Sequence, residues 1–369
     1  ILANLLVEPV VAPITLLGLL AATIGPVFPW LGNLLMTFGS WFASWIVFIA
    51  NSLSQDPASL LALPSGSIGV LLIAVFVVAT SVAILKRKFK ALLLSALLLL
   101  AWFGTSIGGI IHSAAWPIKD WDIVACDVGQ GDSLVLRNHG QIAVVDVGKD
   151  PELVDGCLDR LGVKKIDLLV LTHFDFDHVG GLSGLERGRE IKLALISPFP
   201  DERPTALFMK RELTDVAQQV VAADFGLTGE LGGMSWTVFS SLGDRAESSN
   251  QGSLGIRFES SDMVIYTLAD LDERVQAKAV ARVSGSSKPT IVKVSHHGSA
   301  DQSAEFYKKI GADLALISVG VGNSYGHPTS KILRILGELG TKVLRTDRQG
   351  AISVKVNQGV IEALVTGAR

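Results

Sequence analysis

The first 118 residues carry almost no charge, and this constrains the fold more than any other feature of the chain. Four apolar stretches fill the segment, at residues 10–25, 30–53, 67–85 and 91–111. Apolar stretches of about 20 residues are long enough to cross a bilayer as helices. We therefore expect residues 1–118 to form transmembrane helices. The charged residues of this segment are Glu8, Asp56, Lys86, Arg87, Lys88 and Lys90.

The stretch at residues 30–53 differs from the others, because it mixes polar residues with Trp30, Trp41 and Trp45. Tryptophan is enriched at membrane–water interfaces. This stretch is therefore predicted to be either an interfacial helix or a further span. A buried helical bundle in a water-soluble protein is the alternative, but two long uncharged stretches on either side of a basic pentapeptide disfavour it.

The basic pentapeptide KRKFK, at residues 86–90, predicts the orientation of the chain. Short loops rich in Lys and Arg lie on the cytoplasmic side of a membrane. The helix at 91–111 would then leave the cytoplasm, so we expect a multi-pass protein of the cell membrane with an extracytoplasmic C-terminal domain. The chain begins at Ile1 without a methionine, and we expect it to be part of a longer protein.

From Trp121 onward the sequence changes to short apolar runs separated by Gly, Asn and Asp, which is typical of strands with interspersed helices. We expect residues 119–369 to form one layered domain with mixed sheets. The formal net charge of −3 lacks the basic footprint of many nucleic-acid-binding proteins, so any such contact would be local. Cys126 and Cys157 belong to no C-x-x-C motif, and each is predicted to be a buried or incidental thiol.

Side chains that bind metals follow several of the predicted strands. HFDFDH, at residues 173–178, places two histidines and two aspartates within six residues, directly after an apolar run. Imidazole nitrogens and carboxylate oxygens together are ligands for Zn²⁺, Mn²⁺ or Fe²⁺. A lone histidine here would be read as a hydrogen-bonded structural residue, but this density predicts a two-metal hydrolase loop. Further candidates at strand ends are Asp146, Asp270, His296 and His297.

Five motifs in this order resemble the ComEC competence family: DVGQGDS (127–133), HFDFDHVGGL (173–182), VSHHGS (294–299), SYGHP (324–328) and RTDRQGAI (345–352). HFDFDH also resembles the H-x-H-x-D-H signature of the metallo-β-lactamase superfamily. Residues 4–22 are similar to the end of the membrane competence domain. The resemblance implies an αββα sandwich over 119–369, preceded by a transmembrane or interfacial helical segment over 1–118. It also implies DNA uptake, together with an N-terminal channel part and other components of the uptake machinery.

The resemblance implies a role for each candidate ligand. His173 and Asp175 would bind one metal ion, Asp177 and His178 a second, and Asp270 would bridge the two. His296 would complete the second site, with His297 as the second choice.

Other residues would act around these ligands. Asp146 would orient them by hydrogen bonds. His327 would contact the scissile phosphate or protonate the leaving group; the alternative is a loop histidine held by local hydrogen bonds. Asp127 and Asp132 lie in a Gly-containing turn that is either an anion-binding nest or a structural turn.

The sequence departs from the superfamily pattern at two points. Asp175 stands in place of the second histidine, and no histidine lies between His178 and His296. Asn250 stands where the ComEC family tends to have an asparagine. Because carboxylate-rich sites favour Mn²⁺, we expect two divalent ions, Mn²⁺ before Zn²⁺.

These features predict a metal-dependent phosphodiesterase. The resemblance implies that it degrades the DNA strand that is not imported, while the other strand enters the cell. Lys293, Arg345 or Arg348 would stabilise the transition-state charge if they line the cleft. Stacking aromatics are expected for single-stranded DNA, and the candidates are Phe174, Phe176 and Trp236, although core packing suits them better.

Two alternatives stay open. The first is a membrane-tethered hydrolase of lactones, β-lactams or small phosphoesters. The second is a domain that guides DNA in the channel without catalysis.

Overall fold

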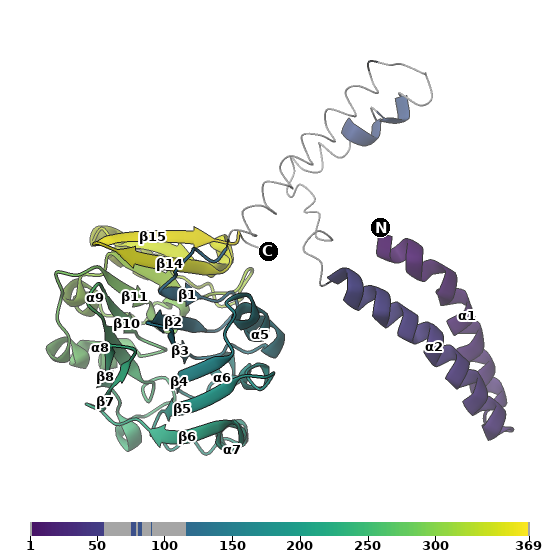
Figure 1. Ribbon diagram of the computed structural model, residues 1–369, viewed down its shortest axis with the longest axis horizontal. Coiled ribbons are helices and arrows are strands. Elements are labelled where there is room, and N and C mark those ends of the chain that lie inside the picture. Colours follow the sequence, from purple (N-terminus) through teal and green to yellow (C-terminus); the bar gives the residue numbers. More distant parts are fainter. Residues whose placement is uncertain (1, 55–74, 79, 83–89, 91–115, 368–369) are drawn as a thin grey trace. The chain divides into compact units, whose positions relative to one another are not determined.

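The computed structural model describes residues 2–54, 75–78, 80–82, 90 and 116–367 (Figure 1). The chain divides into two compact units, Ile1–Ile111 and His112–Arg369. Each unit is described by itself below.

The N-terminal unit contains two apolar helices, α1 (Leu2–Ile24) and α2 (Pro29–Ser54), which run side by side. Gly25 and Gly32 allow their close approach, because a side chain on Gly32 would collide with the backbone of Gly25. Both helices are long and apolar enough to cross a bilayer. The sequence predicts this for the stretch at 10–25, and for that at 30–53 it leaves an interfacial helix or a span open. Most of the stretches at 67–85, 86–90 and 91–111 lies outside the described residues.

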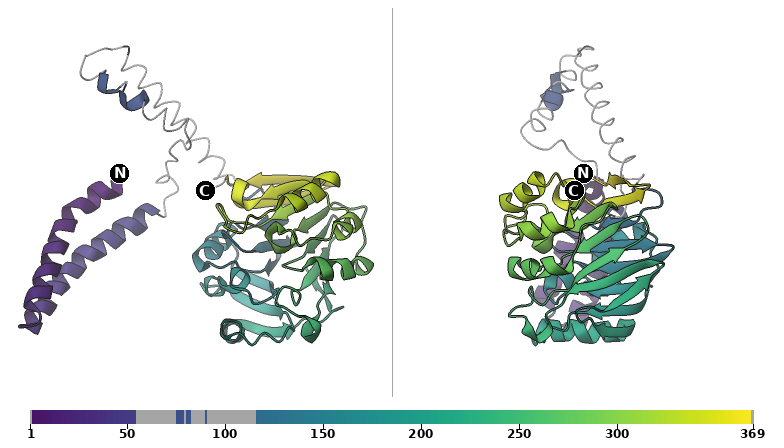
Figure 2. Two further views of the ribbon diagram at one scale, coloured as in Figure 1. Left: turned by 180° about the vertical axis from the view of Figure 1, so that it is seen from behind. Right: turned by 90° about the vertical axis from the view of Figure 1, so that its left-hand side faces the viewer.

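The C-terminal unit is built on two sheets (Figures 1 and 2). The strand order of the first is β15-β14-β1-β2-β3-β4-β5-β6, and that of the second is β13-β12-β11-β10-β9-β8-β7. The strands of the first sheet are β1 (Ile123–Ala125), β2 (Leu134–Asn138), β3 (Gln141–Val145), β4 (Lys165–Leu171), β5 (Glu190–Ile196), β6 (Ala217–Ala222), β14 (Ile352–Asn357) and β15 (Val360–Val365). Those of the second are β7 (Thr228–Leu231), β8 (Met234–Ser240), β9 (Gly255–Glu259), β10 (Val264–Thr267), β11 (Thr290–Lys293), β12 (Leu314–Ile317) and β13 (Lys342–Arg345).

Both sheets are mixed. The pairs β3–β4, β4–β5 and β5–β6 are parallel, whereas β1–β2 and β2–β3 are antiparallel. In the second sheet β10–β11, β11–β12 and β12–β13 are parallel, and β8–β9 is antiparallel. Parallel strands end at the same edge of a sheet, so the loops after β3, β4 and β5 gather at one edge of the first sheet, and those after β10, β11 and β12 at one edge of the second.

Apolar residues alternate along the strands and separate three hydrophobic cores. In β1, Ile123 belongs to the core between the two sheets, while the neighbouring Val124 belongs to the core under the helices. The outer core of the first sheet packs on α5 (Pro151–Arg160) and α7 (Pro204–Val216), and that of the second on α8 (Glu273–Ala279), α9 (Ala304–Ile310) and α10 (Ser330–Glu338). The layers are helix, sheet, sheet, helix, as the αββα sandwich predicts. Two short helices, α6 (Phe176–Val179) and α11 (Thr346–Gln349), complete the unit.

Cys126 and Cys157 form a disulfide, with their Cα atoms 6.0 Å apart. The prediction of two separate thiols was therefore wrong. Cys126 directly follows β1 and Cys157 lies in α5, which packs on the outer face of the same sheet. Nothing in the spacing of 31 residues reveals this pairing, because it depends on where α5 docks. Disulfides are characteristic of proteins outside the reducing cytosol.

Candidate metal centre

Three loops at strand ends bring the predicted ligands together. The loop after β4 carries His173 and leads into α6, which carries Asp177 and His178. Asp270 follows β10, and the pair His296–His297 follows β11 in a short turn. Because β10 and β11 are adjacent and parallel, these last two loops meet at one edge of the second sheet.

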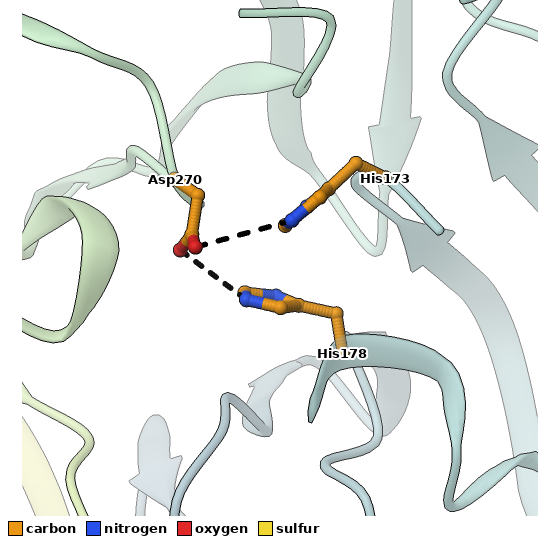
Figure 3. Close-up of side chains that lie close together, drawn as sticks. All are labelled: His173, His178 and Asp270. Carbon is orange, nitrogen blue, oxygen red and sulfur yellow. Dashed lines mark ion pairs between the residues drawn. The ribbon is translucent and has the colours of Figure 1, made fainter. Parts of the chain in front are cut away.

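Asp270 lies at the middle of this cluster and is buried, at 3% exposure. In Figure 3 the side chains of His173 and His178 point toward its carboxylate. The Nε2 atom of His178 lies 3.2 Å from Oδ1, and that of His173 lies 3.9 Å from Oδ2. One carboxylate thus faces two histidines with different oxygens, which is the arrangement expected of a bridging group.

A second group forms around His178 on the side of His297. The Nε2 atom of His297 lies 3.2 Å from Oδ2 of Asp177 and 3.8 Å from Oδ1 of Asp270. The structure therefore places His297, the second choice from sequence, beside Asp177 and His178. His296 lies on the Oδ2 side of Asp270, with its Nε2 atom 3.6 Å from that oxygen and its side chain 31% exposed.

Several buried atoms of the cluster have no hydrogen-bond partner among the described residues. They are Nε2 of His173, Nε2 of His178, Nε2 of His297 and Oδ1 of Asp270, whose contacts within the cluster are at ion-pair distance but lack hydrogen-bond geometry. Buried polar atoms normally have a partner, and leaving one without costs about 1–3 kcal/mol. Ligand atoms of His173, His178 and Asp270 lie within 4.8 Å of one another, as do those of Asp177, His178 and His297. The residues present therefore fit divalent metal ions.

Asp146 fixes the orientation of the loop after β4. Its carboxylate accepts hydrogen bonds from the backbone N–H of Thr172 (2.8 Å) and from the Thr172 hydroxyl (2.7 Å). Its Oδ2 atom also lies 2.8 Å from Nδ1 of His178. The ring of His178 is thereby held with Nε2 toward Asp270, which is the orienting role predicted for Asp146.

A backbone carbonyl and a buried ion pair surround Nδ1 of His297. This atom is hydrogen-bonded to the carbonyl of Ser318 at 3.0 Å and lies 3.0 Å from Oδ1 of Asp132, while Oδ2 of Asp132 is paired with the ammonium of Lys293. Lys293 is only 3% exposed and also donates to the carbonyl of Val294 at 2.8 Å. We expected Lys293 as a cation for the transition state; the structure instead makes it the buried counterion of Asp132.

Asp175 is held by an arginine that the sequence analysis missed. Nη2 of Arg203 lies 2.6 Å from Oδ1 of Asp175, and Nε of Arg203 donates to Oδ1 of the buried Asp201 at 2.9 Å. The other oxygen of Asp175 lies 3.5 Å from Nε2 of His173. Arg203 follows β5 in a loop without any motif, so no sequence signal marks it. One oxygen of Asp175 therefore remains directed at the cluster.

The backbone at the cluster is unusual. Asp146, Ala269, His296 and His297 have φ angles between 46° and 58°, in the left-handed region that non-glycine residues rarely adopt. Such conformations cost on the order of 1–3 kcal/mol each and gather at functional sites. The turn at His296–His297 points the two imidazoles in different directions, with the ring centroids 6.2 Å apart.

His327 lies at the border of the cluster. Its ring centroid is 5.7 Å from that of His296, and its backbone N–H donates to Oδ1 of Asn323 at 3.0 Å. Its Nδ1 atom is buried without a hydrogen-bond partner among the described residues. Burial, together with the positive charges of His296 and His297, lowers the pKa of His327. A neutral imidazole at physiological pH suits hydrogen bonding to a substrate better than proton donation.

The remaining candidate residues lie around the ligand cluster. In the motif 127–133 the backbone N–H of Asp132 donates to the carbonyl of Asp177 at 3.2 Å, and Gly131 leaves room for that approach, so these contacts favour a structural turn. Oδ1 of Asp127 accepts from the backbone N–H of Gly129 at 3.4 Å. The carbonyl of Asn250 accepts from the backbone N–H of Ser253 at 3.1 Å, and the neighbouring Ser249 accepts from Arg203 at 3.1 Å.

The aromatic and basic candidates differ in how far their side chains are buried. Phe174 and Trp236 are buried in the cores, whereas Phe176 is 59% exposed. The Nε atom of Arg345 donates a hydrogen bond to Oδ1 of Asp347 at 2.9 Å. Arg348 lies on α11 and is exposed.

The cluster without metal is a network of opposite charges. Burial alone would lower the pKa of His178, but the carboxylates of Asp270 and Asp146 raise it well above the usual value. Burial likewise opposes protonation of His297, but Asp132 and Asp270 raise its pKa to about 9. Conversely, the histidines outweigh burial and hold the pKa of Asp270 well below the usual range.

These pKa values predict how the stability of the metal-free protein depends on pH. Because the folded-state pKa of His297 is raised from 6.5 to about 9, its protonation stabilises the fold fully below pH 6.5, and this contribution is lost as the pH rises through 9. The full contribution is on the order of 3 kcal/mol. We expect the thermal midpoint of the chelator-treated chain to fall between pH 6.5 and 9, and to fall less in His297→Gln. Equal slopes for both proteins would contradict this assignment.

Comparison with known proteins agrees with this geometry. Residues 126–240 match the family model of the metallo-beta-lactamase superfamily, and residues 1–89 match that of competence proteins. ComE operon protein 3 of Bacillus subtilis is 26% identical over 361 residues, covering 88% of this chain and 44% of that protein. Competence protein ComA of Neisseria gonorrhoeae is 26% identical over 273 residues, covering 73% of this chain and 36% of that protein.

The chain thus spans less than half the length of these two relatives. Among solved structures, the metallo-beta-lactamase fold protein YhfI of Bacillus subtilis is 10% identical, with a TM-score of 0.42 over 60% of this chain and 95% of that chain. The resemblance predicted from the motifs is confirmed: residues 1–89 are similar to competence proteins, and residues 126–240 to the metallo-β-lactamase superfamily.

Proposed function

We propose that this chain is part of a DNA-uptake membrane protein whose metallo-β-lactamase domain hydrolyses the phosphodiester bonds of the strand that is not imported. One observation carries the proposal: unpartnered buried atoms of three histidines converge on the buried carboxylate of Asp270. The fold generally belongs to metal-dependent hydrolases. The match of residues 1–89 to competence proteins supports DNA as the substrate.

The geometry supports two inequivalent metal sites. We assign Asp177, His178 and His297 to one site, with Asp270 shared between both. His173 and Asp175 form the other, and His296 lies beside it. The site at His173 and Asp175 binds its metal ion more weakly. The guanidinium of Arg203 lies 2.6 Å from Asp175, and its positive charge opposes the approach of a cation.

Three carboxylates and three histidines as ligands favour Mn²⁺, with Zn²⁺ as the alternative. Such an ion, when bound, lowers the pKa of water and polarises a phosphoryl oxygen. The chain's own residues supply the remaining functions. Asp146 orients His178, the carbonyl of Ser318 orients His297, and His327 is placed to form a hydrogen bond with the substrate.

Cleavage of DNA by the purified full chain in detergent tests this function. We expect linear DNA to be degraded with Mn²⁺ and to survive with chelator. Asp270→Asn should lower the rate by more than roughly 100-fold, beyond what the loss of a ligand's hydrogen-bond partner costs. The matched control is Asp167→Asn. Asp167 is a partly buried carboxylate near the start of β4 that pairs with Lys165 and Lys192, whereas the loop with His173 follows the end of that strand.

Two outcomes would contradict the proposal. If DNA survives while a lactone or bis-p-nitrophenyl phosphate is turned over, the domain is a small-ester hydrolase. If DNA binds but no substrate is cleaved with Mn²⁺ or Zn²⁺, the domain is a guiding module.

We further propose that this domain lies outside the cytoplasm. The disulfide Cys126–Cys157 supports this location, because disulfides persist in oxidising compartments. The basic pentapeptide at 86–90 supports it independently.

Reporter fusions test the orientation. We expect alkaline phosphatase fused after Arg369 to be active and green fluorescent protein at the same place to be dark. Fusions after Lys90 should give the reverse result and serve as the control. A fluorescent fusion after Arg369, or free thiols at Cys126 and Cys157 in protein from unreduced cells, would overturn the assignment.

A further inference from the structure

Two exposed aromatic side chains lie on loops that carry the candidate metal centre. Tyr325 is 69% exposed and Phe176 is 59% exposed. A single exposed aromatic residue needs no explanation. Among the described residues of 116–367, however, the other exposed aromatic rings are those of Phe208 and Phe225, and a guanidinium covers the ring of Phe225.

Ring contacts connect Tyr325 to the cluster. Its ring is stacked on that of His327, with centroids 5.9 Å apart and planes at 28°. The ring of His327 lies 5.7 Å from that of His296, whose Nε2 atom lies 3.6 Å from Asp270. Tyr325 is therefore the outermost ring in a row that starts at the central carboxylate.

The loop that carries Tyr325 is braced despite its exposure. The side chain of Asn323 makes two hydrogen bonds to the backbone of His327. Its amide group donates to the carbonyl at 2.8 Å, and its Oδ1 atom accepts from the N–H at 3.0 Å. At the start of the loop, the backbone N–H of Gly320 donates to the side chain of Gln130 at 3.3 Å. Tyr325 is thus held in place before any ligand binds, which lowers the entropic cost of binding.

Phe176 has a fixed position on the other loop. It lies between Asp175 and Asp177, whose carboxylates face His173 and His297. Its ring packs closely against Gly180, where any side chain would collide with it. Phe176 therefore offers an exposed aromatic side chain on the segment that supplies four of the candidate ligands.

We propose that Tyr325 stacks on an unpaired nucleobase next to the phosphodiester being hydrolysed, with Phe176 as a second stacking surface. Stacking of a base on an aromatic side chain contributes about 1–3 kcal/mol and tolerates any sequence. Bases within a duplex already stack on one another, so this contact selects single-stranded DNA over double-stranded DNA. The inference rests on the proposed function, and it adds the form of DNA that the site prefers.

Binding of oligonucleotides to the full chain in detergent tests the inference without catalysis. The probe is a fluorescent single-stranded phosphorothioate oligonucleotide, which resists hydrolysis. We expect Tyr325→Ala to raise its Kd by roughly 5- to 150-fold, the range that corresponds to about 1–3 kcal/mol. Tyr325→Phe should keep most of the affinity, because the ring remains. Phe225→Ala is the matched control, an exposed aromatic elsewhere on the unit.

A second probe isolates the base itself. The same oligonucleotide with abasic positions should bind the wild-type chain with a higher Kd than the intact oligonucleotide. In Tyr325→Ala the difference in Kd between the two probes should be much smaller. If Tyr325→Ala binds like wild type, or if abasic positions have no effect, the stacking role is overturned even when DNA is cleaved. If stacking is seen but no DNA is hydrolysed with Mn²⁺ or Zn²⁺, the proposed function fails and the stacking role stands.

Discussion

The buried carboxylate of Asp270 is the interaction on which the site depends. It brings together histidines from two sheets, since His173 and His178 follow β4 whereas Asp270 and His297 follow β10 and β11. A carboxylate in such surroundings would ordinarily lose its charge, but the protonated histidines keep it ionised in the metal-free protein. Metal ions therefore compete with protons for the same nitrogen atoms.

A second layer of residues keeps this cluster in place. Three outer carboxylates each have a partner of their own: Asp146 the hydroxyl of Thr172, Asp132 the ammonium of Lys293, and Asp175 the guanidinium of Arg203. The two cations, Lys293 and Arg203, offset part of the negative charge around Asp270. The three partners also turn one atom of each histidine or carboxylate toward the centre. The site is thus organised before any metal ion binds.

Local patterns in the sequence predicted a layered domain with mixed sheets and the loop that carries most candidate ligands, while the αββα arrangement was implied by the resemblance of the motifs to a known family. Strand alternation reveals the layers, and HFDFDH places its ligands within one loop. What it could not predict depends on long-range packing. The disulfide requires α5 to dock beside Cys126, and the burial of Lys293 follows from its position in a central strand. Arg203 and Tyr325 lie in loops whose positions no periodicity encodes.

The roles of His296 and His297 also could not be assigned from the sequence. Adjacent residues with φ angles of 48° and 52° direct their rings differently, and no pattern in VSHHGS indicates which ring faces Asp177.

Anomalous diffraction from crystals of the Mn²⁺-loaded protein tests the central claim most directly. The account predicts an anomalous peak within bonding distance of Asp270, His178 and His297, and a weaker peak beside His173 and Asp175. A fully loaded crystal with no peak at Asp270 would contradict it.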